Sequence, residues 1–416
     1  MFTSHQLRHD CRLCHSAKLD KVLSLASTPP ANELLVASGD VKAQEKFPLD
    51  LYFCTECYHL QLLDVVSPER LFNNYVYVSG TTPSFRQHFQ QYASQIIKDY
   101  AVDIDSLIVD IGSNDGTLLS SFKDLGMRVQ GVDPAIEISA KASANGIDTI
   151  TAFFTSEIAQ NIKESKGTAK IVLANNVFAH VDNLHGILEG VNILLDLDGI
   201  FVIEVSYLKD VIDKTLFDTI YHEHLDYHSV GPLRSFFKKN QFEVIDVVAI
   251  ESHGGSIRVV AQKKNGKYRE RPSVDSFVAR EAASGLFLAE TFRSFEHKIN
   301  RLGHDLKKLI SSVKAEGKTI AGYGLPAKAT TLMHQFDIGS DAIDYVVDDS
   351  PLKQNLYSPG YGIKIVNSQV LKTDTPDYII VLAWNFAEPI IKNLNWFLED
   401  GGIIVVPLPE IKIVRK

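Results

Sequence analysis

The stretch from Asp218 to His228 concentrates side chains that can move protons. It contains histidines, carboxylates and tyrosines, and Tyr221, Glu223 and His224 fall within one short segment of it. Histidine titrates near neutral pH, and an adjacent carboxylate or phenol can orient and tune it. We therefore expect general acid–base chemistry here. A metal site is one alternative, although His-Glu-His lacks the His-x-x-x-His spacing of a helical metal site, and a solvated polar loop is another.

The cysteines predict a metal site near the N-terminus. They form two Cys-x-x-Cys pairs, made by Cys11, Cys14, Cys54 and Cys57. Disulfides are rare in a reducing compartment, whereas two such pairs supply the four thiolates of a closed tetrahedral zinc site. We therefore expect structural Zn²⁺, with a reduced, metal-free set of thiols as the alternative. His15 and His59 flank the pairs and are expected on the surface.

A glycine-bearing turn follows the apolar run 107–109, which predicts a buried parallel strand. Glycine allows a tight turn and close approach of a ligand, and an acid ending the next strand can accept both hydroxyls of a ribose. Acids in the turn would repel a pyrophosphate, unlike the Gly-x-Gly-x-x-Gly turn of dinucleotide-binding proteins. The turn resembles the first motif of class I methyltransferases. This resemblance implies an S-adenosylmethionine site made by Asp110, Gly112, Asn114, Asp115, Gly116, Asp133 and Asn176. An ordinary strand–turn–helix unit without ligand is the alternative.

The elements that position these residues alternate between strands and helices. Apolar runs predict central strands at 107–109, 129–133, 147–154, 169–174, 199–205, 242–250 and 256–262. Such alternation predicts an α/β fold with a largely parallel sheet that binds ligands beyond the carboxyl ends of its strands. The glycine turn, Asp133 and the segment 175–180, which includes His180, all fall at that edge.

The C-terminal quarter predicts a second Rossmann-like unit. A helical stretch over 273–316 precedes it, with apolar residues mostly three or four apart. The segment 322–327 reads Gly-x-Gly-x-x-Ala, with Lys328 at its mouth and an acid after the next strand. This turn could bind NAD, bind the nucleotide of a substrate, or bind nothing.

Length and charge limit the remaining possibilities. The chain has 416 residues and a formal net charge of −9, which argues against a broad nucleic-acid or membrane surface. The apolar runs are too short to span a bilayer and no apolar signal core begins the chain, so we expect a cytoplasmic protein. We expect a zinc-binding module at 1–72, a class I methyltransferase domain at 73–270, a helical connector at 271–317 and a Rossmann-like domain at 318–416.

The motifs together resemble one family over nearly the whole chain, the sugar C-methyltransferases that methylate C-3 of nucleotide-linked 4-ketohexoses. The matching segments are the two cysteine pairs and residues 75–79, 110–116, 221–224, 253–258, 322–328 and 345–348. The resemblance implies removal of the C-3 proton to form an enolate, followed by C-methylation. It implies that His224 is the base, that Tyr221 and Glu223 contact the sugar or orient the base, and that His180 shuttles a proton or binds the C-4 oxygen. The choice of base between the two histidines stays open.

The resemblance also implies where the substrate lies. A thymidine-diphosphate-linked sugar would bind between the central and C-terminal domains through Tyr75, Tyr77, Ser79, Arg258, Tyr323 and Lys328. From the residues alone, the two tyrosines at 75 and 77 could equally be a half-buried aromatic pair. We expect a monomer, because all modules lie on one chain. Two other functions fit parts of the sequence: an NAD-dependent sugar-nucleotide oxidoreductase using the turn at Gly322 and Gly324, and a non-catalytic binding protein.

Overall fold

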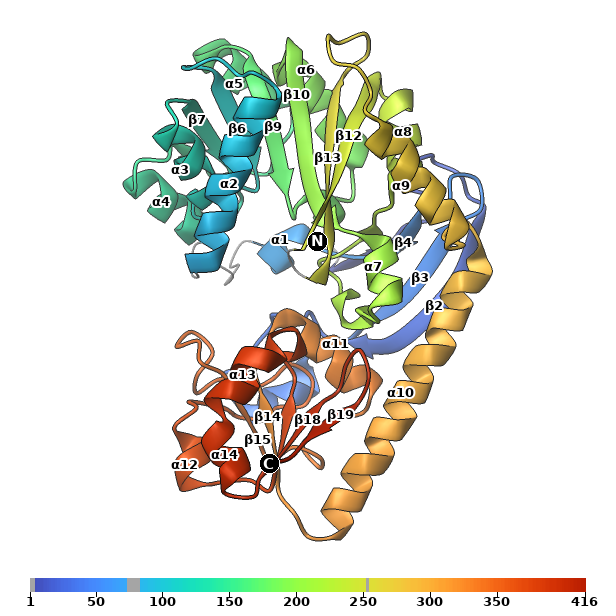
Figure 1. Cartoon of the computed structure of the whole chain (residues 1–416), viewed down its shortest axis with the longest axis vertical. Helices are drawn as coiled ribbons and strands as arrows, with labels where there is room; N and C mark the ends of the chain where they lie inside the picture. Colours follow the sequence, from blue (N-terminus) through green and yellow to red (C-terminus); the bar gives the residue numbers. More distant parts are fainter. Residues whose placement is uncertain (1–3, 73–82, 252–253) are drawn as a thin grey trace.

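The computed structural model describes residues 4–72, 83–251 and 254–416. Within these residues the strands form four sheets. Figure 1 shows two α/β units, the central one above the C-terminal one, with an N-terminal sheet between them and one long helix, α10, running along their side. The three types of unit expected from the sequence are therefore present.

The N-terminal sheet is antiparallel and borrows a strand from the central part of the chain. Its order is β11-β4-β3-β2. Strands β2 (Leu19–Thr28), β3 (Phe47–Cys54) and β4 (Leu60–Leu62) come from the cysteine-bearing segment, whereas β11 (Asp226–Tyr227) comes from the histidine-rich stretch. A separate small sheet pairs β1 (His5–Leu7) with β5 (Asp64–Val66), and the short helix α1 (Pro68–Phe72) follows.

The central unit has a seven-stranded sheet in the order β12-β13-β10-β9-β6-β7-β8. The strands β6 to β10 are parallel, and β13 is antiparallel to both of its neighbours. The strands are β6 (Leu107–Ile111), β7 (Arg128–Val132), β8 (Thr149–Ile150), β9 (Ala169–Asn175), β10 (Leu195–Ser206), β12 (Phe242–Ile250) and β13 (Ser256–Lys263). The helices are α2 (Pro83–Asp99), α3 (Thr117–Asp124), α4 (Ile136–Ala144), α5 (Ser156–Lys166), α6 (Leu184–Leu194), α7 (Leu208–Asp213) and α8 (Val230–Lys239).

The third strand is shorter than predicted. The sequence predicted a strand over 147–154, but only Thr149–Ile150 pairs with β7. After that pairing the chain leaves the sheet edge, and the Thr155 side chain caps α5 by accepting a hydrogen bond from the Ile158 amide.

The C-terminal unit has a six-stranded sheet in the order β16-β15-β14-β17-β18-β19, parallel except for β19. Its strands are β14 (Ile320–Tyr323), β15 (Tyr345–Val347), β16 (Ile365–Val366), β17 (Tyr378–Val381), β18 (Ile403–Val406) and β19 (Lys412–Val414). Its helices are α11 (Ala327–Gln335), α12 (Val370–Thr373), α13 (Ala387–Asn393) and α14 (Asn395–Glu399).

Two helices, not one continuous helical stretch, connect the α/β units. They are α9 (Pro272–Ala283) and α10 (Ala289–Ala315). The prediction of one stretch over 273–316 was wrong at the break, where Gly285 has a φ of +76° that a continuing helix cannot accommodate. Helix α10 buries Phe292, Phe295 and Leu306 in the same core as the N-terminal sheet and the C-terminal unit.

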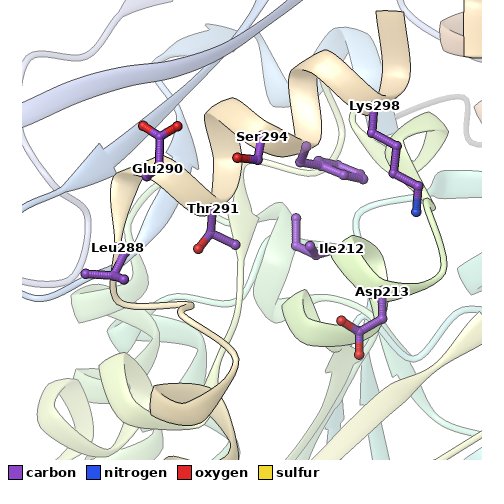
Figure 2. Close-up of a pocket in the computed structure, with 8 residues that line it drawn as sticks. Ile212, Asp213, Leu288, Glu290, Thr291, Ser294 and Lys298 are labelled. Atoms are coloured by element: carbon purple, nitrogen blue, oxygen red, sulfur yellow. The ribbon is translucent and has the colours of Figure 1, made fainter. Parts of the chain in front are cut away.

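A surface groove lies where α7 approaches α10, and Figure 2 shows its lining. Its volume is about 530 Å³, and its lining residues are Ile212, Asp213, Leu288, Glu290, Thr291, Ser294, Phe295 and Lys298. None of the predicted site residues lines this groove. Among the described residues, no helix is both long and apolar enough to cross a membrane.

Candidate active site

The four cysteines come together as the sequence predicted. Their sulfur atoms all lie within 4.8 Å of one another. The distance is 3.5 Å both between Cys11 Sγ and Cys57 Sγ and between Cys14 Sγ and Cys54 Sγ. Four thiolates around one zinc ion at its usual bond length lie about 3.8 Å apart. The donor set therefore fits a tetrahedral Zn²⁺ site with no open position.

Both cysteine loops have the same backbone design. The amide of His15 donates to the Cys11 carbonyl and that of Tyr58 to the Cys54 carbonyl, each at 2.8 Å. His15 and Tyr58 follow the second cysteine of each pair and have φ values of +60° and +66°. Each loop thus closes at a residue with a left-handed backbone conformation. This closure directs the two sulfur atoms of the loop toward those of the other loop.

The expectation that His59 lies on the surface was wrong. Its side chain is fully buried, and its Nε2 atom lies 2.6 Å from Asp226 Oδ1. Burial raises the pKa of Asp226, but the Arg12 guanidinium and His59 outweigh burial and hold that pKa below its usual value. The burial of Asp226 by the N-terminal module could not be read from local sequence, because the two segments are far apart in the chain.

The glycine turn occupies the carboxyl end of β6, where the cofactor site was predicted. Gly112 and Gly116 have φ values of +70° and +76°. A Cβ atom on Gly112 would lie 2.3 Å from Val177 Cγ2, so this position is sterically closed to other residues. Asn114 also has a positive φ, and Asp115 Oδ1 accepts hydrogen bonds from the amide and hydroxyl of Thr117 at the start of α3.

Two buried carboxyl groups, those of Asp110 and Asp133, lie at this turn. Asp133 accepts hydrogen bonds from the amides of Asn114 at 2.8 Å and Ala135 at 2.9 Å. Asp110 Oδ1 has no hydrogen-bond partner among the described residues. Burial, together with the charge of Asp133, raises the pKa of Asp110 to about 8. This buried pair of carboxyl groups suits a cationic ligand and disfavours a phosphate.

His224 is oriented by hydrogen bonds to both ring nitrogens. Its Nδ1 atom lies 2.7 Å from the Thr219 carbonyl oxygen, and its Nε2 atom lies 3.1 Å from the Tyr221 hydroxyl. A carbonyl can only accept, so the ring hydrogen of neutral His224 is on Nδ1. Nε2 then carries the lone pair and accepts from Tyr221. This is the arrangement that a general base requires.

His180 adjoins His224 although the two come from different loops. The centres of their rings are 4.9 Å apart, and the Phe72 ring stacks on His180 with 5.6 Å between the ring centres. Burial and the neighbouring His224 lower the pKa of His180 well below its usual value, which favours a neutral imidazole. Both histidines line one recess with Asn176 at the carboxyl edge of the sheet.

The stretch 218–228 is largely buried, so the alternative of a solvated polar loop was wrong. Glu223 is 2% exposed, and its Oε1 atom accepts a hydrogen bond from Asn32 Nδ2 at 2.7 Å. His222 is fully buried against the Phe47 carbonyl, and burial lowers its pKa to about 4. The N-terminal module therefore covers this stretch.

Arg258 lies on β13 and is engaged inside the central unit. Its guanidinium contacts Glu204 Oε2 through Nε at 3.1 Å and Nη2 at 2.8 Å. The same group lies over the Tyr92 ring at 3.5 Å. Burial raises the pKa of Glu204, but His88 and Arg258 more than offset that effect and lower it overall.

The C-terminal turn repeats the design of the cofactor turn. Gly324 has a φ of +79°, and Asp348 accepts a hydrogen bond from the Leu325 amide at 2.8 Å, as Asp133 does from Asn114. The Tyr323 hydroxyl donates to Asp349 at 3.2 Å, and burial followed by the charge of Asp349 raises the pKa of Tyr323 to about 12.

Lys328 joins a contact between the C-terminal unit and the histidine stretch. Its Nζ atom lies 5.0 Å from the centre of the Trp384 ring, and Trp384 Nε1 donates to Asp218 Oδ2 at 2.6 Å. Burial raises the pKa of Asp218 against the opposing effects of Lys328 and Trp384. The sequence did not predict this interdomain link, since Trp384 belongs to no recognisable motif and Asp218 stood out only as part of the stretch 218–228.

The predicted site residues thus fall into three groups. The cofactor residues and the pair His180–His224 share one edge of the central sheet, and Tyr323 and Lys328 lie on the C-terminal unit. Tyr75, Tyr77 and Ser79 lie outside the described residues. The cofactor, catalytic and substrate roles of individual residues remain predictions.

The fold and the cofactor turn define a class I S-adenosylmethionine-dependent methyltransferase. Three family models match the chain in succession: "Putative zinc binding domain" over residues 11–72, "Methyltransferase domain" over 85–247 and "C-methyltransferase C-terminal domain" over 251–409. The chain is also 37% identical to the C-methyltransferase NovU of Streptomyces niveus over 406 residues. This alignment covers 97% of this chain and 96% of NovU.

Solved structures resemble about half of the chain. The PH0226 protein from Pyrococcus horikoshii OT3 is 14% identical, with 47% of this chain and 98% of that chain covered and a TM-score of 0.37. Magnesium protoporphyrin IX methyltransferase from Synechocystis PCC 6803, solved with bound SAH, is 15% identical, with 43% and 83% covered and a TM-score of 0.35.

The chain belongs to the C-methyltransferase family, as its similarity to NovU over nearly its whole length shows. It is an S-adenosylmethionine-dependent C-methyltransferase with an N-terminal zinc-binding module. This assignment replaces the alternatives of an NAD-dependent oxidoreductase and a non-catalytic binding protein.

Proposed function

We propose that this enzyme methylates C-3 of a nucleotide-linked 4-keto-6-deoxy sugar, with thymidine diphosphate as the nucleotide, in branched-chain deoxysugar biosynthesis. The observation that carries the proposal is the Thr219–His224–Tyr221 hydrogen-bond chain beside His180. A ketone at C-4 makes the C-3 proton removable, because the resulting carbanion is an enolate. Such a reaction needs a base and a partner for the C-4 oxygen, and it needs no metal.

His224 is the proposed base. Its Nε2 lone pair takes the C-3 proton, while the hydrogen bond from Nδ1 to the Thr219 carbonyl supports the positive charge that the ring gains. The Tyr221 hydroxyl, which donates to Nε2 in the free enzyme, would shift to the sugar when the base is used. Glu223 holds this segment through Asn32.

His180 is the proposed partner of the C-4 oxygen. Its low pKa keeps the ring neutral near pH 7, so it can donate one hydrogen bond to a developing enolate without adding a formal charge. The alternative, with His180 as the base and His224 as the donor, predicts the opposite pattern in the variants described below.

The cofactor would be held by the turn 110–116 with Asp133 and Asn176. When bound, S-adenosylmethionine supplies an electrophilic methyl group: the C–C bond forms at C-3 as the S–CH₃ bond breaks, leaving S-adenosylhomocysteine. Asp133 follows β7 and would present negative charge to the cation, and Asp110 on β6 would ionise when that cation binds beside it, while the backbone around Gly112 allows close approach.

The nucleotide is proposed to lie against the C-terminal unit. Lys328, at the start of α11, would supply positive charge to the diphosphate, and Tyr323 would contact the nucleotide from the same turn. We include Tyr75, Tyr77 and Ser79 on the basis of the family resemblance alone. Arg258 already has a buried carboxylate partner, so we assign the phosphates to Lys328 and give Arg258 the role of fixing Glu204.

We further propose a cytoplasmic enzyme that acts as a monomer, with domains at 1–72, 73–270, 271–317 and 318–416. The support for one chain per active unit is that the N-terminal, central and C-terminal parts all contact the histidine stretch within a single chain, through Asn32, Ala179 and Thr331.

Isotope exchange separates the proton step from the methyl step. A thymidine-diphosphate-linked 4-keto-6-deoxyhexose, with or without its 2-hydroxyl, is incubated in heavy water with and without S-adenosylmethionine and followed by mass spectrometry and carbon NMR. We expect deuterium at C-3 without cofactor and a methyl group on C-3 with it. His224→Gln should abolish exchange while leaving cofactor binding unchanged by calorimetry, and His180→Gln should retain slower exchange.

Three results would contradict the proposal. A methyl group on oxygen without deuterium exchange would make the enzyme an O-methyltransferase. Exchange that survives His224→Gln but not His180→Gln would reverse the two histidines. If the enzyme neither exchanges deuterium nor transfers a methyl group with either sugar, the proposed substrate is refuted.

A further inference from the structure

A fully buried arginine lies inside the first cysteine pair. Arg12 follows Cys11, and its side chain has no exposed surface. Burying a guanidinium is costly unless charged and hydrogen-bonding partners surround it. A zinc loop needs only its two cysteines for binding, so the placement of this charge calls for another explanation.

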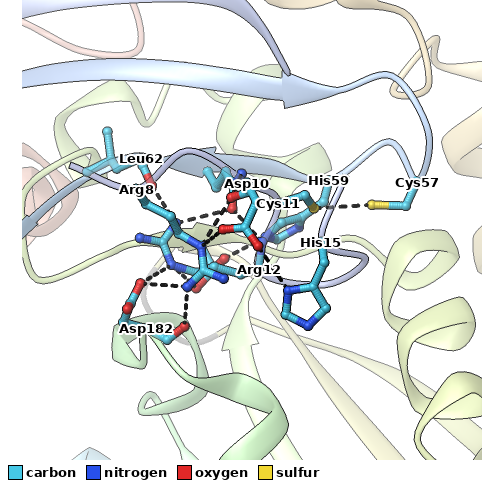
Figure 3. Close-up of polar contacts among 11 residues, drawn as sticks. Arg8, Asp10, Cys11, Arg12, His15, Cys57, His59, Leu62 and Asp182 are labelled. Carbon is cyan, nitrogen blue, oxygen red and sulfur yellow. Dashed lines mark hydrogen bonds and ion pairs between the residues drawn. The ribbon is translucent and has the colours of Figure 1, made fainter. Parts of the chain in front are cut away.

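The partners of Arg12 come from the two loops that carry the active-site histidines. Its Nε atom lies 2.9 Å from Asp182 Oδ1 and 3.9 Å from Asp226 Oδ2. Asp182 comes two residues after His180, and Asp226 comes two residues after His224. Figure 3 shows Arg12 with Arg8 and Asp182 at the cysteine loops.

The Nη1 atom and the backbone amide of Arg12 fix its own position. Nη1 donates to Gln61 Oε1 at 3.2 Å and to the Leu62 carbonyl, and the Arg12 amide donates to the same Gln61 oxygen at 3.0 Å. Gln61 and Leu62 belong to β4, so the guanidinium is held against the strand that pairs with β11. The Arg12 side chain is therefore held in one position by hydrogen bonds, unlike a flexible cation on the surface.

The backbone joins the same two loops. The Leu225 amide donates to the Ala179 carbonyl and the Leu62 amide donates to the Leu225 carbonyl, each at 2.8 Å. These bonds set the spacing of residues 179 and 225, each adjacent to a site histidine. Among the described residues, Arg12 is the cation that reaches both of the aspartates that follow, and Arg8 adds a second contact to Asp182 Oδ1 at 3.1 Å.

We propose that Arg12 is a positioning residue for catalysis: by bridging Asp182 and Asp226, it sets the relative placement of the His180 and His224 imidazoles. The inference rests on the proposed function only in assigning these two histidines to the reaction. It gives the zinc module a role beyond stability, since the loop between Cys11 and Cys14 then helps to arrange the active site.

Arg12→Lys and Asp182→Asn test this inference from its two ends. Lysine keeps the charge but cannot span both carboxylates, and asparagine at the half-exposed position 182 removes one charge without changing side-chain size. Arg293→Lys is the control, because Arg293 pairs with Asp20 on β2, away from the histidines. Each variant is prepared as the full chain, and zinc content and thermal unfolding are measured first.

The decisive readout does not need a substrate. Proton–nitrogen correlation spectra of histidine-labelled enzyme report the tautomer and environment of each imidazole, with His180→Gln and His224→Gln providing the assignments. We expect the His180 and His224 resonances to move in Arg12→Lys and Asp182→Asn but not in Arg293→Lys. The kcat for deuterium exchange should fall about 10- to 100-fold in both test variants, the usual effect of a small misplacement, with unchanged affinity for S-adenosylmethionine.

The outcomes separate this inference from the proposed function. Unchanged histidine resonances in a folded, zinc-loaded test variant would overturn the positioning role. Suppose instead that the histidine resonances shift in the test variants while the wild-type enzyme exchanges no deuterium into the sugar. That combination would support the positioning role and refute the proposed substrate. If Arg12→Lys loses zinc or does not fold, Asp182→Asn decides alone: normal resonances and kcat in that variant overturn the inference.

Discussion

The carboxylate pair of the cofactor turn should make the stability of the cofactor-free enzyme depend on pH. Burial and the charge of Asp133 raise the pKa of Asp110 from 3.8 to about 8 in the folded chain. A carboxyl group with a higher pKa when folded binds more protons in the folded state than in the unfolded state. Its contribution to the free energy of unfolding is therefore fully present below about pH 4 and is lost as the pH rises toward 8.

The size of the effect follows from the pKa difference. Each unit corresponds to about 1.4 kcal/mol, so ionisation of Asp110 should reduce the free energy of unfolding by roughly 4 kcal/mol between pH 4 and pH 7. Asp110→Asn is neutral at every pH and keeps nearly the same shape. The variant should therefore be more stable than wild type at pH 8 and lose this advantage as the pH is lowered.

Calorimetric unfolding of both proteins without cofactor, at intervals from pH 5 to pH 9, measures this difference. Comparing wild type with the variant removes the contribution of titrating groups that do not interact with Asp110. Asp105→Asn is the control, because the Asp105 side chain is 80% exposed and its replacement should leave the pH dependence unchanged. The assignment of a raised pKa to Asp110 is refuted if the free energies of unfolding of wild type and Asp110→Asn differ by the same amount at every pH in this range.

Three further predictions concern the metal, the turn and the base. Cys54→Ser should lose zinc and lower the unfolding temperature, whereas His15→Ala should keep zinc, as measured by atomic emission; full zinc occupancy in the serine variant would contradict the four-thiolate site. Gly112→Ala should destabilise the central unit by about 2–4 kcal/mol, because it combines a left-handed φ with a clash against Val177, and adding Val177→Ala should restore only the part due to the clash. Tyr221→Phe should slow deuterium exchange about tenfold with unchanged zinc and cofactor binding, because the hydrogen bond that Tyr221 is proposed to transfer from His224 to the sugar is worth about 1.4 kcal/mol; an unchanged rate would remove Tyr221 from the reaction.

The architecture was predictable because its determinants are local. The strand at 107–111, the glycine turn after it and the two cysteine pairs are each encoded within a few residues, and the structure confirms the strand and brings the four sulfur atoms together. The errors occur where tertiary context decides. The edge strand at 147–154 shortens because only two residues find a partner, and the helix at 273–316 breaks at Gly285.

The environment of the site was much less predictable. The sheet edge and the family resemblance placed His180 and His224 near each other, but no local pattern showed that Arg12 would meet Asp182 and Asp226, each two residues beyond one of these histidines. The pairing of β4 with β11 joins residues far apart in the chain, and its formation buries what looked like a polar loop. Two features of the sequence could have drawn attention to this cluster. An acid follows each site histidine by two residues, and a cation lies inside a cysteine pair.

The histidine stretch is held by every part of the chain, which explains why the reaction would need all of them. From the N-terminal side, β4 pairs with β11 and Asn32 binds Glu223. From the C-terminal side, Thr331 Oγ1 donates to the Ile220 carbonyl at 2.8 Å. A stretch without regular structure over most of its length has little rigidity of its own, so the orientation of His224 must come from these contacts. The zinc module and the C-terminal unit then act on the chemistry of the central domain by fixing one loop, even where neither supplies a reacting group.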